Sequence, residues 1–359
     1  MPALEEALTG RRALLPVPAN DATRANLLRN TQHPGQPIDG GIALVVATSG
    51  STGTPKGAQL TAANLISSAD ATHQYLGGEG QWLLAMPAAY IAGLQVLVRS
   101  MVAGVEPEFL DLSRGFNVAE LAEKTRTLVS TGERCYTALT PLQLGKATSS
   151  LQGIEALRSF TAVLVGGAAT NPRLLESARK LRINVVTTYG SSETSGGCVY
   201  DGHPIAGAQV RIRDGRIHLG GPMVARGYRN LPGDAAFAEP GWFATSDAGS
   251  LADGTLTVHG RLDNVIVTGG MKLHPEVLES FMLGIEGVTA ASVVGVADER
   301  FGQRICAAYT GSAPVAALME AFDDLPRWQI PKEVTPVPAL PLLGPGKVDR
   351  AAVRELFAR

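Results

Sequence analysis

The chain of 359 residues is predicted to fold as an α/β protein with two domains. The larger domain, residues 1–262, is expected to hold mostly parallel sheets flanked by helices together with a small β-rich part. The smaller, residues 263–359, is expected to be a mobile α+β domain. Three observations predict this division. Apolar runs alternate with amphipathic segments between residues 41 and 190, the pattern of a helix-flanked parallel sheet. Short β-like pieces separated by Asp-Gly turns follow, and strand and helix patterns mix again from residue 263 onward.

The elements of the large domain follow from these patterns. Residues 1–40 are expected to form a short helix followed by loop. Strands are predicted at 42–47, 82–86, 135–139, 161–165 and 184–188. Helices are predicted at 62–75, 94–103, 118–130 and 172–181, the last capped by Asn171 and begun by Pro172. Ligands of parallel sheets bind at the carboxyl ends of strands, so the segment after residue 47 is expected at such an end.

The remaining elements are shorter. Antiparallel hairpins are predicted from the pieces 209–212, 216–219 and 256–259, with Asp-Gly turns at 214–215 and 253–254. In the small domain we expect a strand at 265–267, a helix at 275–282, paired strands at 290–296 and 305–309, and helices at 314–322 and 349–357.

Composition excludes several classes of protein. The chain is 45% hydrophobic and 18% charged, as in an ordinary globular protein, and its formal charge of −2 gives no reason to expect nucleic acid as a partner. No apolar run is long enough for a membrane span, and the N-terminus lacks the apolar segment of a signal peptide. Three widely spaced cysteines argue against a disulfide framework or a zinc site. A cytoplasmic location is therefore expected; the sequence leaves the oligomeric state open, a homo-oligomer included.

The segment 48–57, Thr-Ser-Gly-Ser-Thr-Gly-Thr-Pro-Lys-Gly, is the strongest candidate binding site. Glycines let backbone N–H groups converge on an anion, while hydroxyls and a lysine add donors and charge. It is not a Walker A loop, since Lys56 precedes Gly57, and the alternative is a surface loop. The candidate phosphate-binding residues are Thr48, Ser49, Gly50, Ser51, Thr52, Gly53 and Lys56.

Further candidates lie downstream. Tyr189, at a strand end, could stack on a purine, and Glu193 could bind Mg²⁺ beside a polyphosphate, or else be a solvated carboxylate. Asp247 could accept ribose hydroxyls, with a turn-forming role as the alternative. Arg261 could contact a phosphate or form a structural ion pair. Lys347, in a Gly-Pro-Gly-Lys loop, is either solvated or a cation brought to the site by domain movement.

Four stretches in order, 48–57, 189–193, 241–247 with 260–263, and 346–349, resemble the adenylate-forming superfamily of acyl- and aryl-CoA synthetases, adenylation domains and luciferases. The resemblance covers residues 41–359. It implies that a carboxylate attacks the α-phosphate of ATP, and that the small domain then rotates so that coenzyme A attacks the acyl-adenylate.

The resemblance also implies individual roles. Lys347 would bridge the carboxylate and the α-phosphate, and Glu193 would bind Mg²⁺. Asp263 would be the hinge. Residues implied around the nucleotide, besides the loop, are Gly166, Gly167, Ala168, Tyr189, Gly190, Ser191, Ser192, Asp247 and Arg261. Residues implied for the pantetheine tunnel of coenzyme A are Gly269, Gly270 and Lys272.

The acid pocket is expected near residues 86–93, Met-Pro-Ala-Ala-Tyr-Ile-Ala-Gly, where relatives often carry a histidine and this chain has Tyr90. The alternative for Tyr90 is a core aromatic residue. Gly93 belongs to the same run, and the small residues Ser195, Gly196 and Gly197 would leave room for a ring. Lys146 is a candidate partner for a second substrate carboxylate, or a solvated helix lysine.

A short ligase with this run resembles the o-succinylbenzoate–CoA ligases of actinobacterial menaquinone synthesis. Only 47 residues precede the glycine-rich segment, so most of the family's N-terminal subdomain is expected to be absent. The alternatives are a ligase for another aryl or medium-chain acid, a domain that acylates a carrier protein, and a non-catalytic nucleotide-binding relative.

Overall fold

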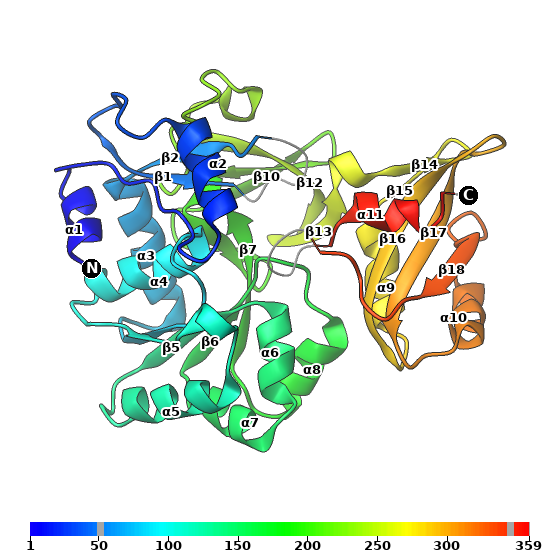
Figure 1. The fold of residues 1–359 in the computed structure, drawn as a ribbon, viewed down its shortest axis with the longest axis horizontal. Coiled ribbons are helices and arrows are strands. Elements are labelled where there is room, and N and C mark those ends of the chain that lie inside the picture. The colour runs from blue at the N-terminus through cyan, green and yellow to red at the C-terminus, as the bar shows by residue number, and fades with distance from the viewer. Residues whose placement is uncertain (49–53, 343–347, 359) are drawn as a thin grey trace.

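The computed structural model describes residues 1–48, 54–342 and 348–358. Figure 1 shows a larger part built around the parallel sheet and a smaller part, yellow to red, that begins after β13. In the described residues the strands form four sheets. Ser49–Gly53 and Lys347, which carry predicted roles, lie outside the described residues.

The central sheet has seven strands in the order β4-β3-β5-β6-β7-β8-β9. These are β3 (Gln81–Leu84), β4 (Glu108–Phe109), β5 (Cys135–Leu139), β6 (Ala162–Val165), β7 (Val185–Ser191), β8 (Gly196–Tyr200) and β9 (His203–Pro204). Pairing is parallel from β4 through β7 and antiparallel from β7 to β9. The predicted parallel sheet is confirmed, and its order puts the ends of β6 and β7 next to each other.

Helices cover both faces of this sheet. Because successive strand residues point to opposite sides, Leu83 packs into one core and Trp82 into another. The helices are α3 (Ala62–Leu76), α4 (Ile91–Val102), α5 (Val118–Val129), α6 (Pro141–Thr148), α7 (Leu151–Arg158) and α8 (Pro172–Lys180). Asn171 caps α8 through its side chain, as predicted.

The N-terminal region differs from the prediction in two respects. It contains two helices, α1 (Pro2–Leu8) and α2 (Ala22–Gln32), and the side chain of Asp21 caps the second. The predicted strand at 42–47 is β1 (Ile42–Ala47), but it pairs antiparallel with β2 (Gly57–Thr61) in a sheet of their own. The prediction that the glycine-rich segment follows a strand of the parallel sheet was therefore wrong. It joins the two strands of a hairpin, and β2 leads into α3 through a capping box of Thr61 and Asn64.

The β-rich part is a four-stranded antiparallel sheet, as predicted. Its strands are β10 (Gln209–Arg213), β11 (Arg216–Gly220), β12 (Trp242–Ala252) and β13 (Thr255–Arg261). Both Asp-Gly turns have positive φ at both residues, the geometry of type I′ hairpins. β12 is the longest of these strands and was not predicted.

The C-terminal part has a five-stranded sheet of its own. Its elements are β14 (Ile266–Thr268), β15 (Met271–Leu273), α9 (Pro275–Leu283), β16 (Val288–Asp298), β17 (Gly302–Gly311), α10 (Val315–Ala321), β18 (Glu333–Pro336) and α11 (Arg350–Glu355). Five short 3₁₀ turns complete the described chain: η1 (Leu112–Arg114), η2 (Ser192–Thr194), η3 (Ala235–Phe237), η4 (Leu262–Asn264) and η5 (Phe322–Asp324). The mixed α+β pattern is confirmed; β15 and β18 were not predicted.

None of the helices in the described ranges has both the length and the hydropathy needed to span a bilayer.

A buried polar cluster lies between α3, α4 and the central sheet. His73 Nε2 accepts a hydrogen bond from Trp82 Nε1 at 3.1 Å, and Arg99 Nη2 donates to the Tyr200 hydroxyl at 3.3 Å. Arg99 also lies 5.0 Å from the centroid of the Trp82 ring. Burial, with the charge of Arg99, lowers the pKa of His73 to about 4.

This shift predicts a pH-dependent stability. The unfolded chain takes up a proton at His73 below pH 6.5, whereas the folded chain does so only near pH 4. The free energy of unfolding should thus fall as the pH drops between these values, by at most about 1.4 kcal/mol per pH unit. Urea unfolding at pH 7 and pH 5 would measure it, with His73→Gln as the comparison. Equal pH dependence in both proteins would contradict the assignment.

Candidate active site

Glu193 lies in the turn η2, directly after β7, and is only 7% exposed. Its Oε1 accepts a hydrogen bond of 2.6 Å from the Tyr228 hydroxyl, and its backbone carbonyl accepts one of 2.8 Å from the Ala225 N–H. Burial, together with the Glu193 charge, raises the pKa of Tyr228, so the phenol stays protonated and donates. Glu193 is therefore a fixed, buried carboxylate, not a solvated loop residue.

Lys56 approaches the same tyrosine from the other side. Its Nζ lies 4.7 Å from the centroid of the Tyr228 ring and 2.8 Å from Asp234 Oδ2. Although partial burial opposes it, hydrogen bonding from Lys56 and the Ala236 N–H lowers the pKa of Asp234. Tyr228 thus links the predicted lysine and the predicted carboxylate, which are 137 positions apart in the chain.

Both ends of the glycine-rich segment are held by neighbouring elements. The Thr48 N–H donates to the Lys56 carbonyl at 2.8 Å, and Arg24 Nη2 donates to the Thr48 carbonyl at 3.0 Å. Asn230 contacts the segment twice: its Nδ2 donates to the Pro55 carbonyl at 2.9 Å and its Oδ1 accepts from the Gly57 N–H at 3.1 Å. The described residues at each end are therefore positioned by α2 and by the 226–234 segment.

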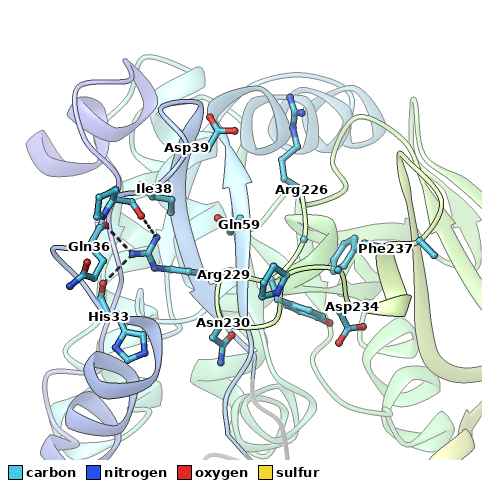
Figure 2. A pocket seen from close by; sticks show the side chains of 16 residues that line it. His33, Gln36, Ile38, Asp39, Gln59, Arg226, Arg229, Asn230, Asp234 and Phe237 are labelled. Atoms are coloured by element: carbon cyan, nitrogen blue, oxygen red, sulfur yellow. Dashed lines mark hydrogen bonds between the residues drawn. The ribbon is translucent and has the colours of Figure 1, made fainter.

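A cavity of about 920 Å³ lies beside Asp234. Figure 2 shows Arg229 reaching across it, and its guanidinium donates to the carbonyls of Gln32, His33 and Gln36 at 2.6, 3.1 and 3.0 Å. Glu193 and Tyr189 do not line this cavity. The cavity is lined in part by the 226–234 segment, and Asp247 and Arg261 do not line it either.

Tyr189 near the end of β7, Asp247 in the middle of β12 and Arg261 at the end of β13 come together. The Tyr189 hydroxyl donates to Asp247 Oδ2 at 2.7 Å, and burial, with the Asp247 charge, raises the pKa of Tyr189. Asp247 and Arg261 are register partners, with Arg261 Nη1 3.9 Å from Asp247 Oδ1. Arg261 pairs more closely with Asp263, at 2.6 Å. The residues implied for ribose and base therefore form one cluster, whose acidic and basic groups are already paired.

Close backbone approaches explain several glycines near this cluster. A Cβ at Gly166 would lie 2.2 Å from Thr188 Oγ1, so the end of β6 packs directly on β7. Gly167 has φ +81°, and Ala168 follows it on the exposed surface. A Cβ at Gly190 would lie 2.1 Å from the Gly196 carbonyl, because β7 and β8 pair there. These glycines bring the residues that the resemblance places beside adenine to the carboxyl ends of β6 and β7.

The predicted acid-pocket residues form a second group. A Cβ at Gly196 would lie 3.4 Å from Gln95 Cγ and 3.9 Å from Ile91 Cγ1, so β8 packs on the first turns of α4. Tyr90 is the N-cap of α4, and a Cβ at Gly93 would lie 2.5 Å from the Pro87 carbonyl. The structure therefore brings the 86–93 run and the 195–197 run together.

Ser191, Ser195 and Gly197 make contacts within the protein that hold the fold together. Ser195 is fully buried and its Oγ donates to the Met223 carbonyl at 2.9 Å. The Ser191 N–H donates to Thr194 Oγ1 at 2.9 Å, within the turn that contains Ser192. A Cβ at Gly197 would lie 2.9 Å from Tyr200 Cε1, so its size is required by packing. Their ligand-binding roles stay predictions.

Lys146 lies apart from this group. It is in the last turn of α6, and its Nζ donates to the Phe116 carbonyl at 3.0 Å beside a separate cavity of about 580 Å³. A different cation lies on α4, two turns beyond Ile91. Arg99 is 3% exposed, its Nε has no hydrogen-bond partner, and among the described residues no carboxylate pairs with it. A buried cation without a carboxylate partner is costly.

The remaining predicted residues are on the C-terminal part. Gly269 and Gly270, with φ +55° and +81°, form the turn between β14 and β15, and Lys272 is exposed on β15. Lys347 is outside the described residues. Leu342 and Val348, on either side, form a bridge, and α11 begins at Arg350.

Sequence reasoning missed Tyr228, Asp234 and Arg99. Tyr228 and Asp234 lie in an irregular segment with no metal- or phosphate-binding spacing, so only their spatial neighbours reveal them. The sequence does carry a signal for Arg99: it is the one charged residue of a mostly apolar helix, at the i+8 position from Ile91. Among the described residues, no group of three or more His, Cys, Asp or Glu side chains could hold a metal ion.

Comparison with known proteins agrees with the motif resemblance. A family model described as AMP-binding enzyme matches residues 7–229. The chain is 46% identical to the probable 2-succinylbenzoate–CoA ligase of Mycobacterium tuberculosis (strain H37Rv), covering 100% of this chain and 95% of that protein. It is 30% identical to the 2-succinylbenzoate–CoA ligase of Geobacillus sp. (strain WCH70), over 88% of this chain and 69% of that one.

Solved structures give the same result. The o-succinylbenzoate CoA synthetase of Bacillus subtilis, in complex with the acyl-adenylate intermediate OSB-AMP, matches with a TM-score of 0.77 and 26% identity, over 89% of this chain and 69% of that chain. The same enzyme in complex with ATP and a magnesium ion matches with a TM-score of 0.73 and 27% identity, over 84% and 67%. The resemblance inferred from four motifs is confirmed.

The Tyr228–Glu193 contact gives a stability prediction. Tyr228→Phe would leave a buried carboxylate oxygen without its donor, so the free energy of unfolding should fall by about 1–3 kcal/mol. Tyr75→Phe is the matched control, because the Tyr75 hydroxyl makes a longer bond of 3.4 Å to Asp201 at the surface. Urea unfolding of both variants measures the difference. Equal losses of unfolding free energy in the two variants would show that the Tyr228–Glu193 bond stabilises the protein no more than a surface hydrogen bond does.

Proposed function

The chain belongs to the AMP-binding enzyme family, and on that premise we propose that it is an ATP-dependent acid–thiol ligase whose acid is 2-succinylbenzoate. It would form an acyl-adenylate first and an acyl-CoA thioester second. The single observation that carries the proposal is the 46% identity to the M. tuberculosis ligase along the whole of this chain. The clusters around Tyr228 and Tyr189 support the nucleotide part of it.

The polyphosphate of ATP would lie between the glycine-rich segment and Glu193. Lys56 would exchange its contact with Asp234 for phosphate oxygens, which the same point charge can bind. Magnesium commonly takes one or two protein carboxylates and completes its shell with phosphates and water, so a single buried carboxylate such as Glu193 fits it. When bound, the ion would neutralise charge on the phosphates.

The nucleoside would lie at the second cluster. Asp247 would accept hydrogen bonds from the ribose hydroxyls, while its existing bond from Tyr189 keeps the carboxylate in place. Arg261 would lie close to the ribose and phosphate. Gly166, Gly167 and Ala168 would flank the base together with Tyr189, and Gly190, Ser191 and Ser192 would form the adjoining backbone.

Attack of one anion on another is opposed by charge, and a fixed cation reduces this barrier. Lys347 would be that cation, next to the carboxylate and the α-phosphate. The domains would be residues 1–262 and 263–359, with Asp263 as the hinge. After rotation, Gly269, Gly270 and Lys272 would face the pantetheine arm of coenzyme A. A cytoplasmic location stays a prediction.

The second carboxylate of 2-succinylbenzoate needs a cation or ordered water in the acid pocket, because a buried unpaired anion is costly. Lys146 is directed toward Phe116, away from the group formed by Tyr90, Gly93, Ser195, Gly196 and Gly197. Arg99 lies on the same helix as Gly93, one turn beyond Gln95, whose side chain lies close to Gly196. It has no carboxylate among its described contacts, so we favour Arg99 over Lys146 as the source of positive charge.

Pyrophosphate release in the presence of ATP, magnesium, coenzyme A and 2-succinylbenzoate tests the proposed reaction. Release should depend on the acid and should fall strongly in Lys347→Ala, because adenylate formation loses its cation. A panel of aryl and medium-chain acids identifies the preferred substrate. No release above the Lys347→Ala background with any acid would favour the non-catalytic alternative.

Steady-state kinetics separate the two candidate cations. Arg99→Lys should raise the KM for 2-succinylbenzoate on the order of tenfold or more, since an imperfectly placed buried charge pair is costly. The KM for a monocarboxylic analogue without the succinyl carboxylate should change little in the same variant. Lys146→Ala should leave both values unchanged. The reverse pattern would restore Lys146 as the partner.

A further inference from the structure

One carboxylate links the C-terminal part to the end of β13. Glu276, in the first turn of α9, accepts hydrogen bonds at Oε1 from Asn264 Nδ2 at 2.7 Å and from Arg350 Nη2 at 3.2 Å. Its Oε2 is buried and has no hydrogen-bond partner among the described residues. That oxygen lies against Gly260, where a Cβ would come within 2.2 Å of it. Glu276 therefore contacts residues on both sides of Asp263.

The same carboxylate belongs to a larger ion-pair network. Arg350 Nη1 donates to Glu279 Oε1 at 2.6 Å and to the Val293 carbonyl at 2.7 Å, while its Nη2 donates to Glu279 Oε2 at 2.8 Å. Burial raises the pKa of Glu279, although Arg350 opposes the shift. A guanidinium held at this many points has a defined orientation. The start of α11 is thus fixed to α9, and α9 to the junction.

The present orientation leaves the predicted coenzyme A turn on the surface. Met271 and Lys272, next to the predicted coenzyme A turn, are exposed. Arg350, three positions after Lys347, is separated from Gly260 by a single carboxylate. With the predicted coenzyme A turn exposed, the present orientation is not the one in which that turn would face the acyl-adenylate, and we assign it to adenylate formation. Rotation about Asp263 would separate Glu276 from Gly260, so the contact can exist in one of the two orientations only.

We propose that Glu276 is a positioning residue that stabilises the orientation used for adenylate formation relative to the orientation used for thioester formation. The inference rests on the proposed ligase function and its domain rotation. Glu276 takes no part in the chemistry. It acts through Gly260, Asn264 and Arg350, and its loss should change the balance between the two half-reactions, not the chemistry of either.

The two half-reactions of the full chain test this balance. Acid-dependent ATP–pyrophosphate exchange measures the first, and conversion of supplied acyl-adenylate with coenzyme A measures the second. In Glu276→Ala the ratio of first to second should fall about fivefold or more. Glu276→Gln, which keeps an acceptor for Asn264, should lower it less. Glu333→Ala is the matched control, because it removes a carboxylate bonded at 2.8 Å to Arg304, away from the junction. A ratio unchanged in Glu276→Ala, or changed equally in Glu333→Ala, would overturn the proposal.

A distance measurement separates this proposal from the proposed reaction. The native cysteines Cys135, Cys198 and Cys306 are buried, so dyes can be attached at the exposed positions Leu142→Cys and Met319→Cys. Without substrates, Glu276→Ala should broaden or shift the energy-transfer distribution, and Glu333→Ala should not. An unchanged distribution in Glu276→Ala overturns the proposed role of Glu276 even if the enzyme is an active ligase. A shifted distribution in a chain without ligase activity supports the role of Glu276 in domain orientation and contradicts the proposed ligase reaction.

Discussion

The site depends on the hydrogen bond between the Tyr228 hydroxyl and Glu193. It joins the turn after β7 to the 226–234 segment, and the ring of Tyr228 extends the link to Lys56. Because a buried carboxylate is costly without a donor, this bond also explains how Glu193 can be held in a fixed, nearly dry position. Asn230 and Arg229, on the same segment, secure Pro55 and the end of α2. One irregular segment thus positions the charges of the proposed phosphate site.

Close packing of small residues places the other groups. Gly166, Gly190 and Gly197 are each required by an approach that a Cβ would prevent, and together they bring the ends of β6, β7 and β8 together. The acid pocket that we propose lies where β8 meets α4. There Gly93 makes the same type of contact, whereas Gly196 is favoured by its φ of +100°. The glycines that a resemblance assigns to ligand binding therefore also have a structural function, and both roles can apply to one residue.

Sequence predicted the fold well where hydrophobic patterns are long. The strands of the parallel sheet, the Asp-Gly hairpins and the C-terminal α+β order are confirmed. The antiparallel partner of β1 was missed, because the five residues of β2 carry no strong pattern and follow a loop that reads as a strand-to-helix turn. Motifs identified Glu193, Tyr189 and Asp247 as one region. Tyr228 and the buried contacts of Glu276 could not be predicted, since each depends on residues distant in sequence meeting in space.

The hydrophobic cores of the two parts share no residue in the described chain. Three clusters contain only residues up to Leu256, and two contain only residues from Ile266 onward. Cooperativity in unfolding comes largely from shared core contacts. Here the described parts share no core residue and are joined by groups at the junction and by a hydrogen bond of 3.3 Å from Asn171 Nδ2 to the Leu283 carbonyl. The chain should therefore unfold as two weakly coupled units. A melting temperature would then belong to one unit or the other, and a substitution could destabilise one unit while leaving the other folded.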